Sequence, residues 1–497
     1  GGGGANDDGT AIKLFDPKDD KKEEQSVIDA SGFTLAANGK KMLVPRPGGK
    51  WQIVEAVPGG GKPQDVSTAA MKQRVDPRVE WKQLFNDAWR LERDYFYVSN
   101  MHGVDWAKVR EQYGAMLADA ASREDVQYIL GEMISQLNIG HAYLGGAGDL
   151  DQPAAPNVAV GMLACDFELG KEGSTGASAY RFKKIYQGGP WDAEARGPLA
   201  LSEPESERIV EGEYLLAVNG TPLDKAKDPW AALVGLADRP VTLTVNVSAL
   251  FDGKQRDVLV TPIGAAADQQ IRFRAWIESN RAEVERASDG QVGYIYVPNT
   301  GVEGQNELFR QFYAQRARAA LIIDDRWNGG GQIPHRFVEL LNRPITNYWA
   351  RRDGKDWSWP PDGHAGPKCM LINGQAGSGG DMFPWLFKTM NLGKLIGGRT
   401  WGGLVGISGV PPLIDGGGVT VPSFGFYKKD GTWGIEGHGV DPDIAVVDDP
   451  GVMLDGGPRT DPQLAAAVKL MVDEVMANPY ERPRRPEGPD RSGMGVL

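Results

Sequence analysis

The sequence predicts a multidomain α/β protein whose largest part is a layered core. The chain has 497 residues, which corresponds to roughly three domains of ordinary size. Hydrophobic residues make up 41% of the chain, enough for several cores. No apolar stretch approaches the about 20 residues that a membrane helix needs. From Gln291 onward, strand patterns alternate with helical patterns, which is typical of a sheet covered by helices.

The segment 1–62 shows short strand patterns separated by turns. Phe33–Val44 reads as a strand, an Asn38-Gly39 turn and a second strand, the pattern of a β-hairpin. The segment resembles part of a β-propeller blade followed by a linker at Pro58–Pro63. Because one blade cannot bury its faces alone, it either docks elsewhere or belongs to a longer protein. We expect the second, since Gly1–Gly4 lacks Met and resembles an internal loop or a cloning remnant.

The segment 63–150 is predicted to be helical and to end near a histidine. Apolar residues such as Trp81 and Phe85 recur at helical spacing. Ser122, followed by acidic residues, is a typical helix start. The helix that begins there brings the chain to His141.

The segment 151–264 changes to strands and resembles a PDZ domain. Strand-rich composition covers Val158–Phe167, Tyr180–Ile185 and Val241–Ser248. The carboxylate-binding loop that such domains use is not clear in the sequence, so peptide capture by this module stays open.

The segment 265–478 is the expected α/β core, and 479–497 is expected to be a flexible or docking tail. Buried-strand patterns at Val292–Val297, Ala320–Asp324 and Lys368–Ile372 each precede a helical pattern. In such folds the active site lies at the carboxyl ends of the strands. Two glycine-rich loops are predicted at this edge.

Ser378 lies in one of these loops and is the candidate nucleophile. It stands among glycines in Asn373–Phe383, after a buried strand and before an apolar helical stretch. Such a turn presents a hydroxyl for attack and leaves backbone N–H groups free. The second loop, Asn328–Gly331, follows the preceding strand. Together the loops predict a nucleophile and an oxyanion hole.

A serine hydroxyl needs a base at neutral pH. Among five histidines, His141 has the best context, between a helix end and a strand, after Gly140. Glu436, in a glycine-rich loop, is a candidate to orient the imidazole. His438 in the same loop is a rival base, and Lys388 and Lys394 are further rivals.

Four sequence blocks together resemble the tricorn protease family, relatives of the carboxy-terminal processing proteases. The resemblance runs from about Pro77 to Glu474, and the blocks are Asn138–Leu144, Ile322–Gly331, Asn373–Phe383 with Gly393–Ile407, and Gly434–Asp443. It implies a crotonase-like serine peptidase core and propellers upstream of the helical segment.

The resemblance assigns roles to particular residues. Ser378 matches the nucleophile, His141 the general base and Glu436 the acidic member. The backbone N–H groups of Gly331 and Gly379 match the oxyanion hole.

Two positions depart from the family pattern. A serine is expected just before the histidine, and here it is Gly140, so Glu436 could reach His141 directly, through water or through another hydroxyl. The acidic residue that selects basic side chains would fall near Trp349, in the aromatic and basic loop Thr346–Arg352. Trp349 is therefore the candidate substrate-binding residue, with an apolar preference at the cleaved position as the hypothesis.

The sister family of carboxy-terminal processing proteases uses a Ser-Lys pair instead. Its lysine would fall in the stretch Thr400-Trp-Gly-Gly403, where this chain has glycine. A histidine mechanism is therefore favoured.

The expected function is a serine peptidase that hydrolyses peptides, in particular oligopeptides from upstream proteolysis, by acyl-enzyme chemistry. One alternative is an inactive peptide-binding homologue, and another is an esterase- or hydratase-like enzyme. No metal or organic cofactor is implied. The net charge of −12 argues against nucleic acid or an anionic membrane as the main partner.

The resemblance further implies a homo-oligomer such as a hexamer. Two distant cysteines, Cys165 and Cys369, form no disulfide framework. Their scarcity favours the cytoplasm, while a periplasmic location stays open if an upstream signal sequence was removed.

Overall fold

The computed structural model describes residues 11–18, 23–68, 70–146, 158–171, 173, 176–189, 195–202, 204–449 and 461–493. It divides into two compact units, Gly1–Glu80 and Trp81–Leu497. Within the described ranges, none of the helices combines the length and apolar character that a membrane span requires.

The first unit consists of two small antiparallel sheets. One pairs β1 (Ala11–Leu14) with β2 (Gln25–Asp29), and the other has the order β3-β4-β5-β6: β3 (Thr34–Leu35), β4 (Lys41–Arg46), β5 (Lys50–Glu55) and β6 (Gln64–Val66). The predicted hairpin is confirmed, since β3 and β4 pair around Gly39, whose φ is +69°.

The expected end of this segment at residue 62 is too early. β6 pairs with β5 beyond that point, so the strand completes the second sheet. The predicted linker carries a short 3-10 turn, Pro58–Gly60, in which Gly60 is buried. The four-stranded antiparallel sheet is the unit from which propellers are built.

Three helices follow the sheets: α1 (Pro77–Tyr95), α2 (Trp106–Met116) and α3 (Arg123–Ser135). Ser122 accepts a hydrogen bond from the Asp125 N–H, and the Asp125 side chain accepts one from the Ser122 N–H, which confirms the predicted helix start. Buried apolar side chains from all three helices form one core.

A distant segment completes this helical core. Leu413, Val419 and Val421 pack into it, although they lie inside the range 265–478 that was expected to form the α/β core. Arg123 and Asp415 form a buried ion pair with 2.7 Å between Nε and Oδ2. The strands of this region are β7 (Leu144–Gly145), β20 (Gly406–Ser408), β21 (Gly418–Val419) and β22 (Val421–Phe424), with β7 paired to β21 and β20 to β22.

The next part is an antiparallel sheet with one core of its own. Its strands are β8 (Cys165–Lys171), β9 (Ser178–Ile185), β10 (Tyr214–Val218), β11 (Thr221–Pro222), β12 (Val241–Asn246) and β13 (Arg256–Val260), in the order β13-β12-β10-β9-β8 with β11 on β10. Short helical turns are α4 (Pro198–Leu201), Glu205–Glu207 and Pro229–Leu233.

The α/β core is built on a five-stranded parallel sheet in the order β14-β15-β18-β19-β23. The strands are β14 (Val292–Tyr296), β15 (Ala320–Asp324), β18 (Lys368–Ile372), β19 (Lys394–Gly397) and β23 (Ile444–Ala445). The helices are α5 (Ala265–Ala287), α6 (Val302–Gln315), α7 (Pro334–Leu341), α8 (Gly379–Thr389) and α10 (Pro462–Ala477).

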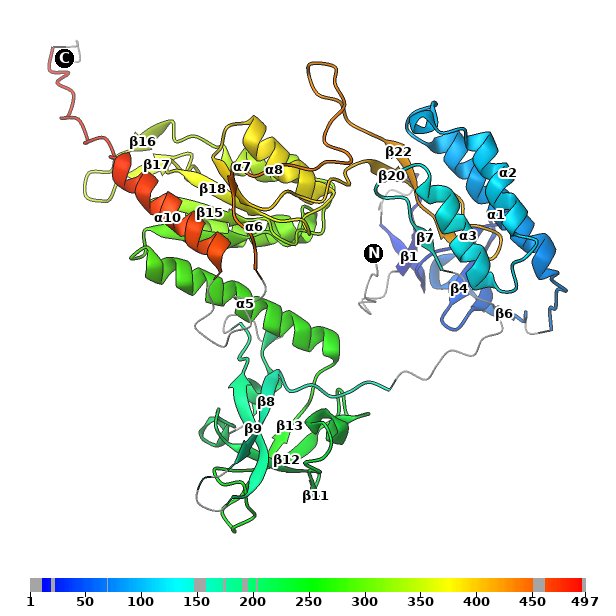
Figure 1. Cartoon of the computed structure of the whole chain (residues 1–497), viewed down its shortest axis with the longest axis horizontal. Coiled ribbons are helices and arrows are strands. Elements are labelled where there is room, and N and C mark those ends of the chain that lie inside the picture. Colours follow the sequence, from blue (N-terminus) through cyan, green and yellow to red (C-terminus); the bar gives the residue numbers. More distant parts are fainter. Residues whose placement is uncertain are drawn as a thin grey trace. The chain divides into compact units, whose positions relative to one another are not determined.

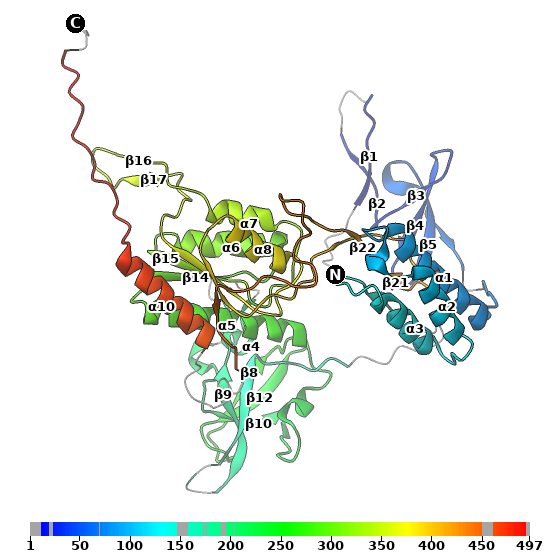
Figure 2. The same cartoon turned by 45° about the horizontal axis from the view of Figure 1, so that its top comes forward.

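Helices cover both faces of this sheet, as Figures 1 and 2 show. Side chains of α5 and α10 pack with one set of strand residues, and side chains of α6, α7 and α8 pack with the alternate set. The layered α/β core is therefore confirmed, and β14, β15 and β18 are buried on both faces.

The chain after α10 docks on a hairpin of the core. The hairpin pairs β16 (Asn347–Trp349) with β17 (Trp357–Trp359). Arg485 forms an ion pair with Asp356 and donates a hydrogen bond to the Arg351 carbonyl. Arg482 stacks 4.7 Å from the centre of the Tyr348 ring. These contacts involve the tail as far as Arg485, and residues 494–497 lie outside the described residues.

Candidate active site

The turn that joins β18 to α8 presents the Ser378 side chain toward a substrate. Its φ is +57°, a region that residues other than glycine rarely adopt. It occupies the N-cap position of α8, and its side chain makes no capping hydrogen bond. The hydroxyl is thus left free at a helix N-terminus, where partial positive charge favours a developing anion.

The two predicted glycine loops meet beside this serine. The Gly377 N–H donates to the Asn328 carbonyl at 3.1 Å. A Cβ added to Gly379 would lie 2.6 Å from the Gly331 nitrogen and 2.0 Å from Thr300 Oγ1, so only glycine fits there. Within the described residues, the N–H groups of Gly331 and Gly379 donate to no protein acceptor. Two neighbouring free donors are what an oxyanion hole requires.

His141 presents one ring nitrogen and buries the other. Among the described residues, Nδ1 has no hydrogen-bond partner and is buried, which leaves Nε2 as the accessible nitrogen. The ring stacks on the indole of Trp401, with centroids 5.4 Å apart and planes 29° apart. Burial lowers the pKa of His141, and the negative charge of Glu436 opposes that effect. A lowered pKa keeps the imidazole neutral, the form that can accept a proton.

Glu436 is held by backbone N–H groups, and none of its hydrogen bonds goes to the imidazole. Oε1 accepts from Gly140 at 3.1 Å, and Oε2 accepts from Leu404 at 2.6 Å and Val405 at 2.8 Å. A Cβ added to Gly140 would lie 3.2 Å from Oε1. The glycine therefore leaves the carboxylate next to the backbone that carries His141.

A single segment, Trp401–Val405, connects all these groups. The Ser378 N–H donates to the Gly403 carbonyl at 3.0 Å. A Cβ added to Gly140 would lie 2.9 Å from Gly403 Cα, so the serine and the histidine loop meet at the same residue. Within the described chain, no direct hydrogen bond joins Ser378 and His141. Such contacts are often loose before substrate binds.

Asp381 anchors this segment to α8. Its carboxylate is buried, and Oδ1 accepts from the Gly402 N–H at 2.8 Å. Burial raises the pKa of Asp381 against hydrogen bonds from Thr400 and Gly402 that lower it. Sequence reasoning missed both Asp381 and Trp401. The sequence held a clue to each position. Asp381 follows Ser378 by three positions, and Trp401 lies among glycines after a buried strand.

The rival bases are engaged elsewhere. His438 Nε2 lies 2.7 Å from Asp441 Oδ2. Lys388, near the far end of α8, forms an ion pair with Asp443 at 2.9 Å. Lys394 begins β19, at the amino edge of the sheet, whereas Ser378 follows a carboxyl edge. None of the three has a described contact with Ser378.

Trp349 does not lie beside Ser378 in the same chain. Its hairpin neighbours Tyr348 and Ser358 line a cavity together with Ala319, which directly precedes β15, and Gly366, two residues before β18. This is the amino edge of the parallel sheet, and Ser378 follows the carboxyl edge. Figures 1 and 2 show the β16–β17 hairpin near the end of α10 that leads into the tail.

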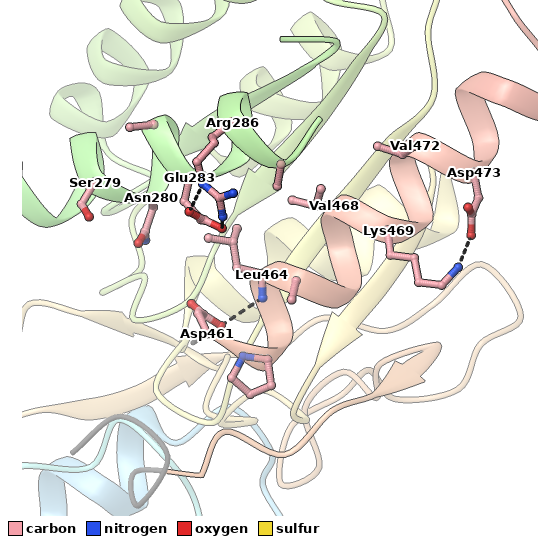
Figure 3. Close-up of a pocket in the computed structure, with 14 residues that line it drawn as sticks. Ser279, Asn280, Glu283, Arg286, Asp461, Leu464, Val468, Lys469, Val472 and Asp473 are labelled. Carbon is pink, nitrogen blue, oxygen red and sulfur yellow. Dashed lines mark hydrogen bonds and ion pairs between the residues drawn. The ribbon is translucent and has the colours of Figure 1, made fainter. Parts of the chain in front are cut away.

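A cavity of about 670 Å³ lies on the other side of the sheet from α8, between α5 and α10 (Figure 3). Its charged side chains are paired, Glu283 with Arg286, Lys469 with Asp473, and Asp461 with Arg326 from outside the cavity. It takes no part in the Ser378 site. No group of three or more His, Cys, Asp or Glu side chains arranged to hold a metal occurs in the part of the chain that the structure describes.

Three family models match separate parts of the chain. Residues 291–446 match the model of peptidase family S41, residues 77–135 the tricorn protease C1 domain, and residues 161–265 the tricorn protease PDZ domain.

Proteins similar to this chain include two that are named for tricorn protease. The chain is 32% identical over 461 residues to tricorn protease homolog 1 of Streptomyces coelicolor, covering 92% of this chain and 41% of that protein. It is 30% identical over 479 residues to the tricorn protease of Thermoplasma volcanium, covering 95% and 44%. The chain thus spans less than half the length of these relatives.

A solved structure is also similar to most of this chain. The crystal structure of the tricorn protease aligns with a TM-score of 0.81 and 28% identity, over 92% of this chain and 42% of that one.

The contact between Trp401 and His141 predicts a shift in the pKa of the imidazole. Trp401→Ala removes much of the cover from the ring, so the pKa of His141 should rise toward its ordinary value. NMR titration of the histidine Cε1 protons measures it, and His141→Gln identifies the resonance. Trp230→Ala, in the turn Pro229–Leu233 beside the antiparallel sheet, is the matched control and should leave the pKa unchanged. An unchanged or lower pKa in Trp401→Ala would contradict this role of the indole.

Proposed function

The chain belongs to the tricorn protease family, and we propose that it hydrolyses peptide bonds through an acyl-enzyme formed on Ser378. Its α/β core is a serine peptidase domain of family S41. The observation that carries the proposal is the convergence of one free hydroxyl and two free backbone N–H groups at the junction of two glycine loops.

In the first step, the Ser378 hydroxyl attacks the carbonyl carbon of the peptide. His141 Nε2 takes the hydroxyl proton and returns it to the leaving amine, so that the peptide bond breaks and an ester forms. Water then attacks the ester, His141 again takes and returns a proton, and the acid product leaves. The lowered pKa of His141 supports this role, because the base must be neutral before each transfer.

The N–H groups of Gly331 and Gly379 stabilise the negative oxygen of each tetrahedral intermediate. Loss of one such donor costs about 2.7–4 kcal/mol of transition-state stabilisation. The N-terminal end of α8 adds partial positive charge at the same position.

Glu436 acts on the imidazole without touching it directly in this proposal. His141 Nδ1 is buried and has no partner, and Glu436 Oε1 lies 3.1 Å from the adjacent Gly140 nitrogen. We infer that a water molecule joins Nδ1–H to this carboxylate. The carboxylate also stabilises the imidazolium through its charge.

Ser378→Ala should lower peptide hydrolysis by a factor on the order of 10⁶, because Ser378 is the proposed nucleophile at the two amides. The measurement is kcat/KM on a fluorogenic peptide, with circular dichroism to check the fold. Ser279→Ala, an exposed serine that lines the α5–α10 cavity, is the control and should retain full activity. Wild-type turnover in Ser378→Ala would refute the assignment.

The inactive peptide-binding homologue is the second candidate, favoured by Gly140 and the unpartnered Nδ1. The same assay separates the two, since a homologue without catalysis should give no difference between wild type and Ser378→Ala.

The proposed substrates are oligopeptides from upstream proteolysis, with an apolar residue on the acyl side of the cleaved bond. Two exposed tryptophans support this preference: Trp327 precedes the Asn328–Gly331 loop, and Trp401 contacts Gly377. Fluorogenic peptides that differ only at that residue should show higher kcat/KM for Leu or Phe than for Lys or Arg. Strong selectivity for Lys or Arg would contradict this expectation.

We further propose a homo-oligomer, a hexamer by family resemblance, in which Trp349 serves the site of a neighbouring copy. Trp349, Trp357 and Trp359 share one face of the β16–β17 hairpin and are all exposed, which is typical of an interface. Light scattering should give a multiple of the 53.8 kDa chain mass. Trp349→Ala should then alter peptide preference, whereas a monomer with unchanged preference would exclude this role.

The proposed compartment is the cytoplasm. Cys165 and Cys369 are both buried free thiols, as expected where thiols stay reduced. Recovery of the protein in a periplasmic fraction would contradict this.

A further inference from the structure

A second cavity lies where the carboxyl-terminal tail meets the core. It measures about 440 Å³ and has walls from the amino edge of the sheet, the β16–β17 hairpin and tail residues Pro479, Tyr480 and Arg482. We call it the tail pocket. Because it opens at the amino edge, it is separate from the Ser378 site.

The charge of the tail pocket is positive in a chain whose net charge is −12. Its described lining includes three guanidinium groups, from Arg316, Arg318 and Arg482, and no carboxylate. Arg318 is neutralised by Glu285 at 2.8 Å. Arg316 and Arg482 form no ion pair within the described residues and instead stack on Tyr313 and Tyr348.

Two nearby carboxylates, those of Asp356 and Asp362, are already paired with arginines. Asp356 is paired with Arg485, which lowers the pKa of the Asp356 carboxyl, and the charge of Arg482 lowers it further. Asp362 is paired with Arg343. The two stacked guanidinium groups therefore keep their charge available for an anion from outside the chain.

Two buried polar atoms of the lining residues, Tyr348 Oη and His364 Nδ1, have no hydrogen-bond partner in the part of the chain that the structure describes. His364 is 5% exposed, and its Nε2 lies 3.0 Å from the Arg318 carbonyl oxygen. A carbonyl only accepts, so Nε2 carries the proton. Burial and the nearby Lys368 lower the pKa of His364 to about 4, so at neutral pH Nδ1 is an acceptor that requires a donor.

These features define a ligand with three parts. It needs an anionic group for Arg316 and Arg482 and an N–H or O–H donor for His364. It also needs an apolar body to lie against Ile345, Pro361 and Val475, which line the same cavity. An inorganic anion lacks the apolar part.

We propose that the tail pocket binds the carboxyl-terminal residue of a short peptide, with its carboxylate between Arg316 and Arg482. The amide N–H of that residue donates to His364 Nδ1, and Tyr348 Oη donates to the carboxylate. Since Arg482 and Tyr480 belong to the tail, an occupied pocket holds the tail against the hairpin.

Isothermal titration calorimetry with N-acetyl-leucine tests this proposal. Such a small ligand should bind with a Kd of about 0.1–1 mM. N-acetyl-leucinamide, which lacks the carboxylate, and inorganic phosphate, which lacks the apolar body, should each bind at least about tenfold more weakly. Use of Ser378→Ala protein alongside wild type separates the result from catalysis, because both should bind equally.

Variants locate the binding to the pocket. Arg482→Gln and Arg316→Gln should each weaken binding about tenfold or more. Arg484→Gln removes the same charge from the same tail outside the pocket and should leave the Kd unchanged. Thermal unfolding of each variant checks the fold.

Three outcomes would overturn the proposal. These are no binding of N-acetyl-leucine, equal binding of the amide or of phosphate, and equal loss in Arg484→Gln and Arg482→Gln. The last would indicate a diffuse attraction to the tail.

Discussion

The whole candidate site depends on the backbone of one short segment, Trp401–Val405. Its carbonyl at Gly403 accepts from Ser378, and its N–H groups at Leu404 and Val405 hold Glu436. Its indole supports His141, and its Gly402 N–H is fixed by the buried Asp381. A displacement of this segment would separate nucleophile, base and acid together. The geometry of the site therefore depends on contacts among three stretches of chain that are distant in sequence.

These contacts stabilise two unfavourable backbone conformations. Ser378 and His141 have φ values of +57° and +58°, each of which costs about 1–3 kcal/mol. Hydrogen bonds around each residue restrain its backbone conformation. The close approach of Gly379 to Gly331 further restrains the backbone next to Ser378. The result is a hydroxyl and an imidazole held at the surface before a substrate arrives, which reduces the ordering that the reaction would otherwise require.

Much of this arrangement could be predicted from the sequence, for identifiable physical reasons. Buried strands followed by glycine loops indicate the carboxyl edge of a parallel sheet, so Ser378, Gly331 and Gly379 could be placed locally. Contacts between distant segments leave no such periodic signal. The stacking of Trp401 on His141, the packing of Val419 and Val421 with the helices, and the hairpin position of Trp349 at the amino edge all depend on tertiary packing. The tail could be predicted only as flexible or docking, because its contacts are made by single arginines.

The most direct test is a crystal structure of the protein after treatment with a serine-directed peptidyl phosphonate. The account predicts a covalent bond from phosphorus to Ser378 Oγ, with the phosphonyl oxygen within hydrogen-bond distance of the Gly331 and Gly379 nitrogens. His141 Nε2 should face the adduct. An adduct on another residue, or one on Ser378 with the imidazole turned away and both amides unoccupied, would contradict it.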